Sequence, residues 1–143
     1  MIVNRSVPVD TILPHVSYQN PVEALEWLKR VFGFREHYRY GDPVSGAQLF
    51  AGKGCLMIKE ARSNPSPRQL GFGTQSLTVF IEDIEEHYLH AKAEGAIIVE
   101  EPQETGYGEF QYAALDLDGH HWLFSRHAKD LSPEDWGARA AQK

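Results

Sequence analysis

The segment NPVEALEWLKRVFGF, from Asn20 to Phe34, carries the clearest structural signal in the chain. Asn20 is a good helix N-cap, and Pro21 suits the first helical position because the N–H that proline lacks would have no partner there. Apolar residues then recur every three or four positions, which is the period of a helix with one buried face. Gly33 fits the left-handed position just after a helix. The segment therefore predicts a capped amphipathic helix.

The same signals return in the second half of the chain. Asp83 can cap a helix that runs through IEEHYLHAKAEG and ends at Gly95. Strand-like runs precede and follow both helices, so each half reads as strand, helix and three strands. Such a repeated order indicates an internal duplication. The predicted strands are 11–18, 34–40, 47–51 and 55–60 in the first half, and 77–81, 96–100, 110–116 and 122–126 in the second.

Composition narrows the class of protein. The 143 residues carry a net charge of -6, which disfavours non-specific nucleic-acid binding because that needs a basic face. No apolar run approaches the ~20 residues of a membrane span, and the N-terminus lacks a signal-peptide pattern. The single cysteine, Cys55, rules out an internal disulfide. We therefore expect a cytoplasmic protein with no nucleic-acid or membrane partner.

Three segments resemble the glyoxalase/bleomycin-resistance/dioxygenase superfamily, also called vicinal oxygen chelate proteins. They are NPVEALEWLKRVFGF (20–34), SLTVFIEDIEEHYLHAKAEGAIIVEEP (76–102) and YGEFQYAALDLDGHHWLF (107–124). The resemblance implies an α+β fold of two βαβββ modules, with curved mixed sheets forming a groove, and a homodimer. Residues 1–143 would form one domain, with module one at about 11–60, a linker at 61–74, module two at about 75–127 and a C-terminal tail at 128–143.

The family includes metal-dependent isomerases, lyases, dioxygenases and thiol transferases, as well as metal-free drug-binding proteins, so the fold does not select the activity. In its metal-dependent members, the first and last strands of each module supply the ligands. The resemblance places those ligands at Leu13, Ile58, Ser76 and Leu123. Leucine and isoleucine cannot bind a metal and serine is a poor ligand. We therefore expect no metal cofactor, and leave open whether the chain is an enzyme.

Strand alternation then predicts which side chains face the groove. His120 and His121 are neighbours, so they point to opposite faces and cannot both reach one metal; His121 shares its face with Leu123. We expect His120 to make a local hydrogen bond or to face solvent, and Trp122 and Phe124 to lie in the core. The predicted ligand-binding residues are His15, Ser17, Ile58, Glu60, Thr78, Phe80, Tyr107, His121 and Leu123.

An alternative set of ligands remains open. His15 and Glu60 lie about two residues beyond the usual ligand positions, and with His121 they could form a displaced site for a divalent metal such as zinc, iron, manganese or nickel. His87 and His90, three residues apart on the second helix, are instead expected on a solvated helix face.

Two functions are compatible with these residues. The first is metal-free binding of a small organic molecule or an antibiotic in the groove, whose mixture of apolar side chains and a few polar groups suits such a ligand. The alternative is a metal-dependent lyase, isomerase or dioxygenase that uses the displaced ligands.

Overall fold

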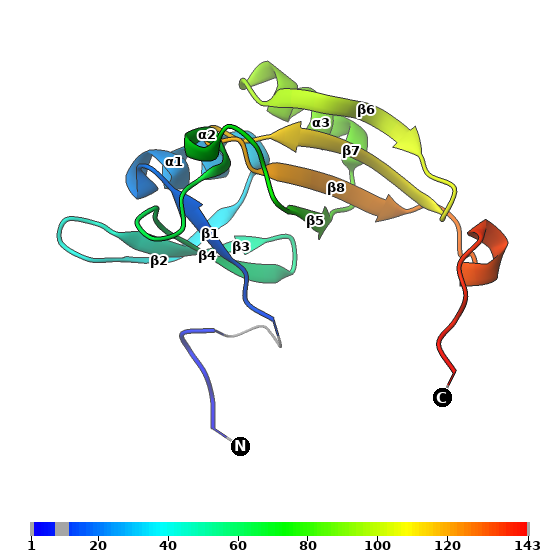
Figure 1. Ribbon diagram of the computed structural model, residues 1–143, viewed down its shortest axis with the longest axis horizontal. Helices are drawn as coiled ribbons and strands as arrows, with labels where there is room; N and C mark the ends of the chain where they lie inside the picture. Colours follow the sequence, from blue (N-terminus) through cyan, green and yellow to red (C-terminus); the bar gives the residue numbers. More distant parts are fainter. Residues whose placement is uncertain (1, 8–11, 143) are drawn as a thin grey trace.

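The computed structural model describes residues 2–7 and 12–142 and contains the two modules in the expected element order (Figure 1). The first module comprises β1 (His15–Tyr18), α1 (Pro21–Phe32), β2 (Arg35–Tyr40), β3 (Gly46–Ala51) and β4 (Gly54–Glu60). The second comprises β5 (Ser76–Phe80), α3 (Ile84–Ala93), β6 (Ile97–Glu104), β7 (Glu109–Leu115) and β8 (His121–His127). The fold is therefore α+β, as predicted.

Each module contributes one four-stranded mixed sheet. The strand orders are β1-β4-β3-β2 and β5-β8-β7-β6, so corresponding strands occupy corresponding places. In each sheet the first strand of the module pairs in parallel with the last, and the other pairs are antiparallel. β1 and β5 therefore each form one edge of their sheet.

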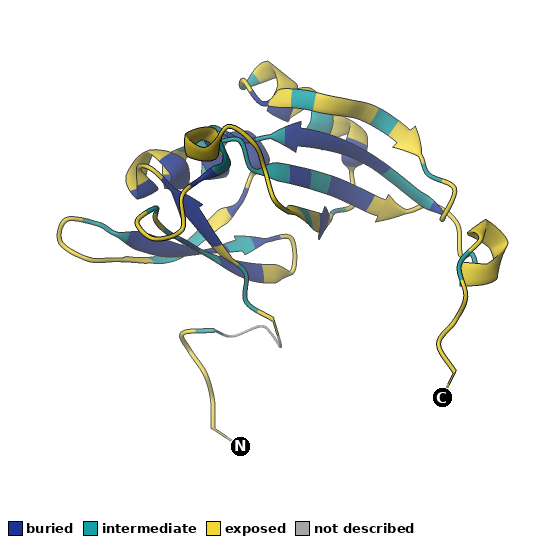
Figure 2. Ribbon diagram, in the orientation of Figure 1, coloured by how far each residue is buried: buried dark blue, intermediate teal, exposed yellow. Residues whose placement is uncertain are grey.

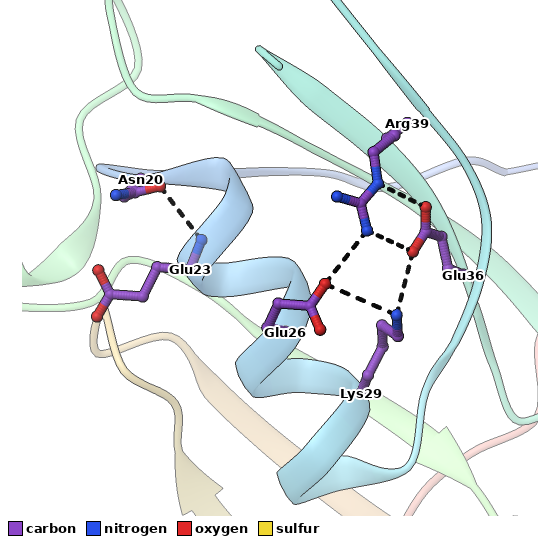
Figure 3. Close-up of polar contacts among 6 residues, drawn as sticks. All are labelled: Asn20, Glu23, Glu26, Lys29, Glu36 and Arg39. Carbon is purple, nitrogen blue, oxygen red and sulfur yellow. Dashed lines mark hydrogen bonds and ion pairs between the residues drawn. The ribbon is translucent and has the colours of Figure 1, made fainter. Parts of the chain in front are cut away.

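The first helix forms for the reasons that its sequence indicates. The Asn20 side chain accepts a hydrogen bond from the backbone N–H of Glu23, and Gly33 ends the helix at φ 71°. On the exposed side, Glu26 and Lys29 of α1 form ion pairs with Arg39 and Glu36 of β2 (Figure 3). These contacts lie on the solvent side of α1, and its apolar residues on the other side pack into the core.

Both modules share one hydrophobic core, which lies between the helix-side faces of the two sheets (Figure 2). Phe32 and Phe34 of the first module contact Trp122 of the second, with ring centroids 5.9 and 5.3 Å apart. Trp122 and Phe124 have no exposed surface, as predicted. Because the helix sides meet in this core, the opposite face of each sheet is directed away from it. We call that opposite face the groove face.

A polar contact joins the modules at the β7–β8 turn. The buried carboxylate of Asp116 accepts hydrogen bonds from the Tyr18 hydroxyl (2.6 Å) and from Nε1 of Trp122 (3.0 Å). Asp118 accepts two more from Gln19, through its backbone N–H and its side-chain amide. The motif DLDGHHW thus connects the second module to β1 and positions the start of β8.

Two histidine predictions were wrong and a third was confirmed. His120 bonds the other module, because its Nε2 donates to the Ser17 carbonyl oxygen at 2.6 Å. His87 is partly buried, and its Nε2 donates to the Phe32 carbonyl oxygen at the end of α1, at 2.8 Å. His90 is exposed as predicted, and its Nε2 donates to the Arg30 carbonyl oxygen at 2.7 Å. The last carbonyls of a helix lack intrahelical partners, which explains why these donors are placed there.

Element boundaries differ modestly from those expected. The first strand begins at His15, and residue 11 of the predicted range lies outside the described residues. β6 continues to Glu104, through residues predicted as loop, because its far end pairs with Gln111 and Phe110 of β7. The linker contains an unpredicted short helix, α2 (Pro67–Leu70), and the tail contains a 3-10 turn, η1 (Pro133–Trp136). Within the described ranges, no helix is long and apolar enough to cross a bilayer.

Candidate functional site

The groove face of the second sheet is open in the single chain. Ser76, Thr78 and Phe80 of β5 are all exposed, and the first two lie beside His121 and Leu123 of β8. Leu77 and Val79 alternate with them and pair with the buried Trp122 and Phe124. The structure therefore places Thr78, Phe80, His121 and Leu123 on one face, as strand alternation predicts.

A cavity of about 880 Å³ lies beside β5 and reaches across to the first module. Thr78 and Phe80 line it together with Ser125 and His127 of β8. Much of the remaining wall is apolar and comes from both modules, including Ile12, Pro14, Leu56, Leu77 and Ile81. The charged residues Lys53, Glu82 and Arg126 also line it. A space of this volume, with a largely apolar wall and several polar groups, matches the usual dimensions of a site for a small organic ligand.

Phe80 is held in place at this cavity. Its ring, 53% exposed, stacks on His127 with centroids 5.1 Å apart and an interplanar angle of 23°. Nδ1 of His127 lies 2.7 Å from Oε1 of Glu109, and the Ser125 hydroxyl lies 3.2 Å from the other oxygen of that carboxylate. The result is an exposed aromatic surface supported by a hydrogen-bonded group of side chains.

The predicted groove residues of the first sheet need correction. Ile58 is fully buried in the core, because it pairs with Val16, whose side chain faces α1. The residues of β4 that share the face of His15 and Ser17 are Met57 and Lys59. Ser17 is only 7% exposed, and its carbonyl accepts the bond from His120. The sequence prediction placed the register of β4 one residue away from the observed one.

Glu60 likewise lies on the helix side, because it pairs with Tyr18. It forms an ion pair with Arg62 at 2.9 Å and lines a different cavity, near Asn20 and Asp42. Three residues separate it from His15 along the sheet, about 10 Å at ~3.3 Å per residue, and the two face opposite ways. Among the described residues, no three His, Cys, Asp or Glu side chains are grouped closely enough to hold a metal, so His15, Glu60 and His121 are not gathered within one chain.

The positions where metal-dependent relatives carry ligands do not fit a metal either. They hold Leu13, Ser76 and Leu123, and the corrected register of β4 adds Met57 or Lys59. None of these supplies an imidazole or a carboxylate, which are the usual protein ligands for zinc and non-haem iron.

The two remaining predicted residues line separate cavities. His121 lines one of about 790 Å³, between the linker and β7. Tyr107 lines one of about 450 Å³, where its ring contacts Trp136 of the tail in an edge-to-face arrangement. The predicted ligand-binding residues are thus spread over several surfaces of the chain.

Comparison with known proteins identifies the class. Residues 12–124 match the family model of the Glyoxalase/Bleomycin resistance protein/Dioxygenase superfamily, and the chain belongs to this family. No curated protein matches the chain.

Solved structures add individual relatives. The crystal structure of TioX from Micromonospora sp. ML1 is similar at 31% identity, over 86% of this chain and all of that one, with a TM-score of 0.69. A glyoxalase/bleomycin resistance protein/dioxygenase family enzyme from Burkholderia phytofirmans PsJN shares the fold at 19% identity and a TM-score of 0.62, over 80% of this chain and 96% of its own.

Sequence reasoning missed several residues beside Phe80. Ser125 and His127 continue the alternation that starts with His121 and Leu123, so the period of two could have identified them. Glu109 could be identified only from the pairing of β7 with β8, which places it opposite His127. Arg68, which lines the same cavity as His121, lies in the linker, where no periodic signal exists.

Proposed function

We propose that this protein binds a small organic molecule, of metabolite or antibiotic size, on the groove face of its second sheet without a metal ion. The observation that carries the proposal is the exposed Phe80 ring, stacked on His127 beside a cavity of about 880 Å³. The ring adjoins the apolar wall of this cavity, and a contiguous apolar surface in a concavity marks binding sites more often than scattered exposed apolar residues do. Binding would consist of burial and stacking, with no covalent step.

The polar groups around Phe80 support a planar ligand with a few hydrogen-bonding atoms. Thr78 provides an exposed hydroxyl on the same face of β5, and the exposed imidazole of His127 lies against the Phe80 ring. Stacking on an aromatic ring stabilises a complex by about 0.5–1.5 kcal/mol beyond the burial of area. Two or three directional bonds would then determine which planar molecules bind.

We further propose that a second copy of the chain covers this face. β5 is an edge strand, and its groove-side residues are exposed in the single chain, so a partner subunit would complete the enclosure of the ligand. Light scattering coupled to size-exclusion chromatography tests this: a mass twice the 16.2 kDa of one chain supports the homodimer, and a mass of one chain contradicts it.

The binding proposal is tested by thermal-shift screening of chelator-treated protein against planar antibiotics and aromatic metabolites. Hits are then titrated into Phe80→Ala and into Leu89→Ala, which removes an exposed side chain from α3. We expect Phe80→Ala to weaken binding by about 1–3 kcal/mol, from lost stacking and burial, and Leu89→Ala to leave it unchanged. Equal affinity in the two variants would contradict the site.

A further inference from the structure

The cavity at His121 lies at the other end of the groove face from Phe80. It measures about 790 Å³ and is an open cavity bounded by the linker on one side and by the end of β7 and the start of β8 on the other. Its lining includes Arg68 and Phe72 of the linker, Leu115 of β7 and His121 of β8. Asp116 also lines it, but this residue is buried and both oxygens of its carboxylate accept hydrogen bonds within the protein. Four residues along β8 separate His121 from Ser125, about 13 Å at ~3.3 Å per residue, so this cavity is distinct from the one at Phe80.

The linker is fixed against the second module, which forms the cavity in advance. The backbone N–H of Arg68 donates to the Asp118 carbonyl at 2.9 Å. Gly119, at φ 83°, lies so close that a Cβ there would be 3.4 Å from the Arg68 nitrogen. Ser66, fully buried, caps α2 through reciprocal bonds with Gln69. A cavity with fixed walls binds a ligand at a lower entropic cost than one that must be ordered.

His121 presents a hydrogen-bond donor to this cavity. Its Nδ1 is buried and has no hydrogen-bond partner. A buried N–H without an acceptor is costly, so the neutral ring carries its proton on Nε2. In the described part of the chain, Nδ1 of His121 is the one buried side-chain nitrogen or oxygen without a hydrogen-bond partner. Nε2 of the same ring is therefore not a buried, unpaired atom. Because the ring lines the cavity, we take Nε2 to be accessible from it. A ligand group next to His121 must therefore accept a hydrogen bond.

Arg68 adds an unpaired positive charge. One guanidinium nitrogen, Nη1, donates to the Leu117 carbonyl at 3.3 Å, which orients the side chain along the turn. Within the described ranges, no carboxylate forms an ion pair with it, although the chain has 20 acidic and 14 basic residues. Its other N–H groups are free to bind an anion in the paired geometry that guanidinium offers to a planar carboxylate.

We propose that this cavity binds the carboxylate of a small, otherwise apolar organic acid. Arg68 and Nε2 of His121 donate to the carboxylate oxygens, and Phe72 and Leu115 contact the apolar body. One guanidinium and one imidazole N–H together offer donors to both oxygens of a single carboxylate. The inference rests on the proposed function, since it assigns a second part of the same groove face to the ligand and names the ligand class as carboxylic acids.

The test compares 2-naphthoate with its neutral counterpart 2-naphthamide on the full-length, chelator-treated protein. Two-dimensional ¹H–¹⁵N NMR follows the backbone amides of Gly71, Gly73 and Gly119 around this cavity and those of Thr78 and Phe80 at the other. We expect naphthoate to shift the three glycine amides and to bind about tenfold more tightly than naphthamide, as one charge-assisted bond allows.

The variant Arg68→Gln should remove that preference, and Arg68→Lys, which keeps the charge but not the paired donors, should retain part of it. Arg139→Gln, an exposed tail position, is the charge-matched control and should behave as the unmodified protein. Equal binding of naphthoate and naphthamide, or an unchanged preference in Arg68→Gln, would overturn the inference. Shifts confined to the amides of Thr78 and Phe80 would overturn the inference but leave the proposed function standing. Shifts confined to the three glycine amides would support the site at His121. If Phe80→Ala also bound every screening hit normally, the proposed site at Phe80 would be excluded.

Discussion

The Tyr18 hydroxyl, at the end of β1, donates a hydrogen bond of 2.6 Å to the buried carboxylate of Asp116, 98 positions later in the sequence. The same carboxylate accepts from Trp122 Nε1 and from the backbone N–H groups of Asp118 and His120. Burial raises the pKa of Asp116, and these donors, with His120, act to lower it. Through this one side chain the β7–β8 turn is bonded to the first module and to the core tryptophan.

Removing the Tyr18 hydroxyl should weaken the connection between modules. Tyr18→Phe leaves a buried carboxylate with one donor fewer, which typically costs about 1–3 kcal/mol of unfolding free energy. Urea denaturation measures the loss, and Tyr40→Phe, at an exposed tyrosine, serves as the control. A double-mutant cycle with Asp116→Asn should give a coupling energy above ~0.5 kcal/mol, and strictly additive losses would show that the two side chains do not act together.

Protonation of His87 should destabilise the fold at mildly acidic pH. Burial lowers the pKa of this histidine from its usual 6.5, and its bond to the Phe32 carbonyl only partly offsets this. The unfolded chain therefore binds the proton more readily, so the contribution of His87 to stability is complete above about pH 6.5 and is lost as the pH falls toward its folded-state pKa.

The comparison is the unfolding free energy at pH 7.5 and at pH 5.5 in His87→Gln and in His15→Gln, a substitution at an exposed histidine of β1. The decline at low pH should be smaller in His87→Gln than in the unmodified chain and unchanged in His15→Gln. An identical decline in all three proteins would exclude this role for His87.

The ion pairs between α1 and β2 should contribute little to the stability of the fold, and a high salt concentration should abolish that contribution (Figure 3). Hydrogen bonding to Arg39 lowers the pKa of Glu36 to about 2. The ionised carboxylate therefore contributes to the stability of the fold above about pH 4.5, and this contribution is lost as the pH falls toward 2. Such partly exposed pairs contribute about 0.2–1 kcal/mol. Glu36→Gln should cost that much at low ionic strength and almost nothing in 1 M NaCl, where screening is strong. A loss that persists in high salt would indicate a packing role instead.

Gly52 should be essential to the shape of the cavity at Phe80. It lies at the tip of the β3–β4 hairpin with φ 60°, and a Cβ there would be only 2.8 Å from the Phe80 carbonyl oxygen. Gly52→Ala should therefore push the hairpin away from β5, lowering stability by about 1 kcal/mol or more and reducing affinity for ligands found by screening. Gly54→Ala, on the same hairpin, meets nothing closer than 3.8 Å and should affect neither property. Equal effects of both substitutions would refute the contact.

Local signals explain why the fold was predictable and much of the site was not. Asn20 and Gly33 act through their own backbone neighbourhood, so the helix they delimit could be predicted. The register of β4, by contrast, depends on its parallel pairing with β1, and a shift of one residue moved Ile58 and Glu60 from the predicted face to the other. The roles of His87 and Arg68 depend on hydrogen bonds between segments far apart in the sequence, and the periodicity of a single segment does not indicate such bonds.

The most direct test of the central claim is calorimetric titration of chelator-treated protein with the strongest hit from the thermal-shift screen, repeated after addition of Zn²⁺, Fe²⁺, Mn²⁺ or Ni²⁺. Non-covalent binding on the groove face without a metal predicts a saturable heat in the chelator-treated protein and a Kd that does not change when the metals are added. Binding, or conversion of the ligand, that occurs only after a metal is restored would contradict the claim and indicate a metal-dependent enzyme.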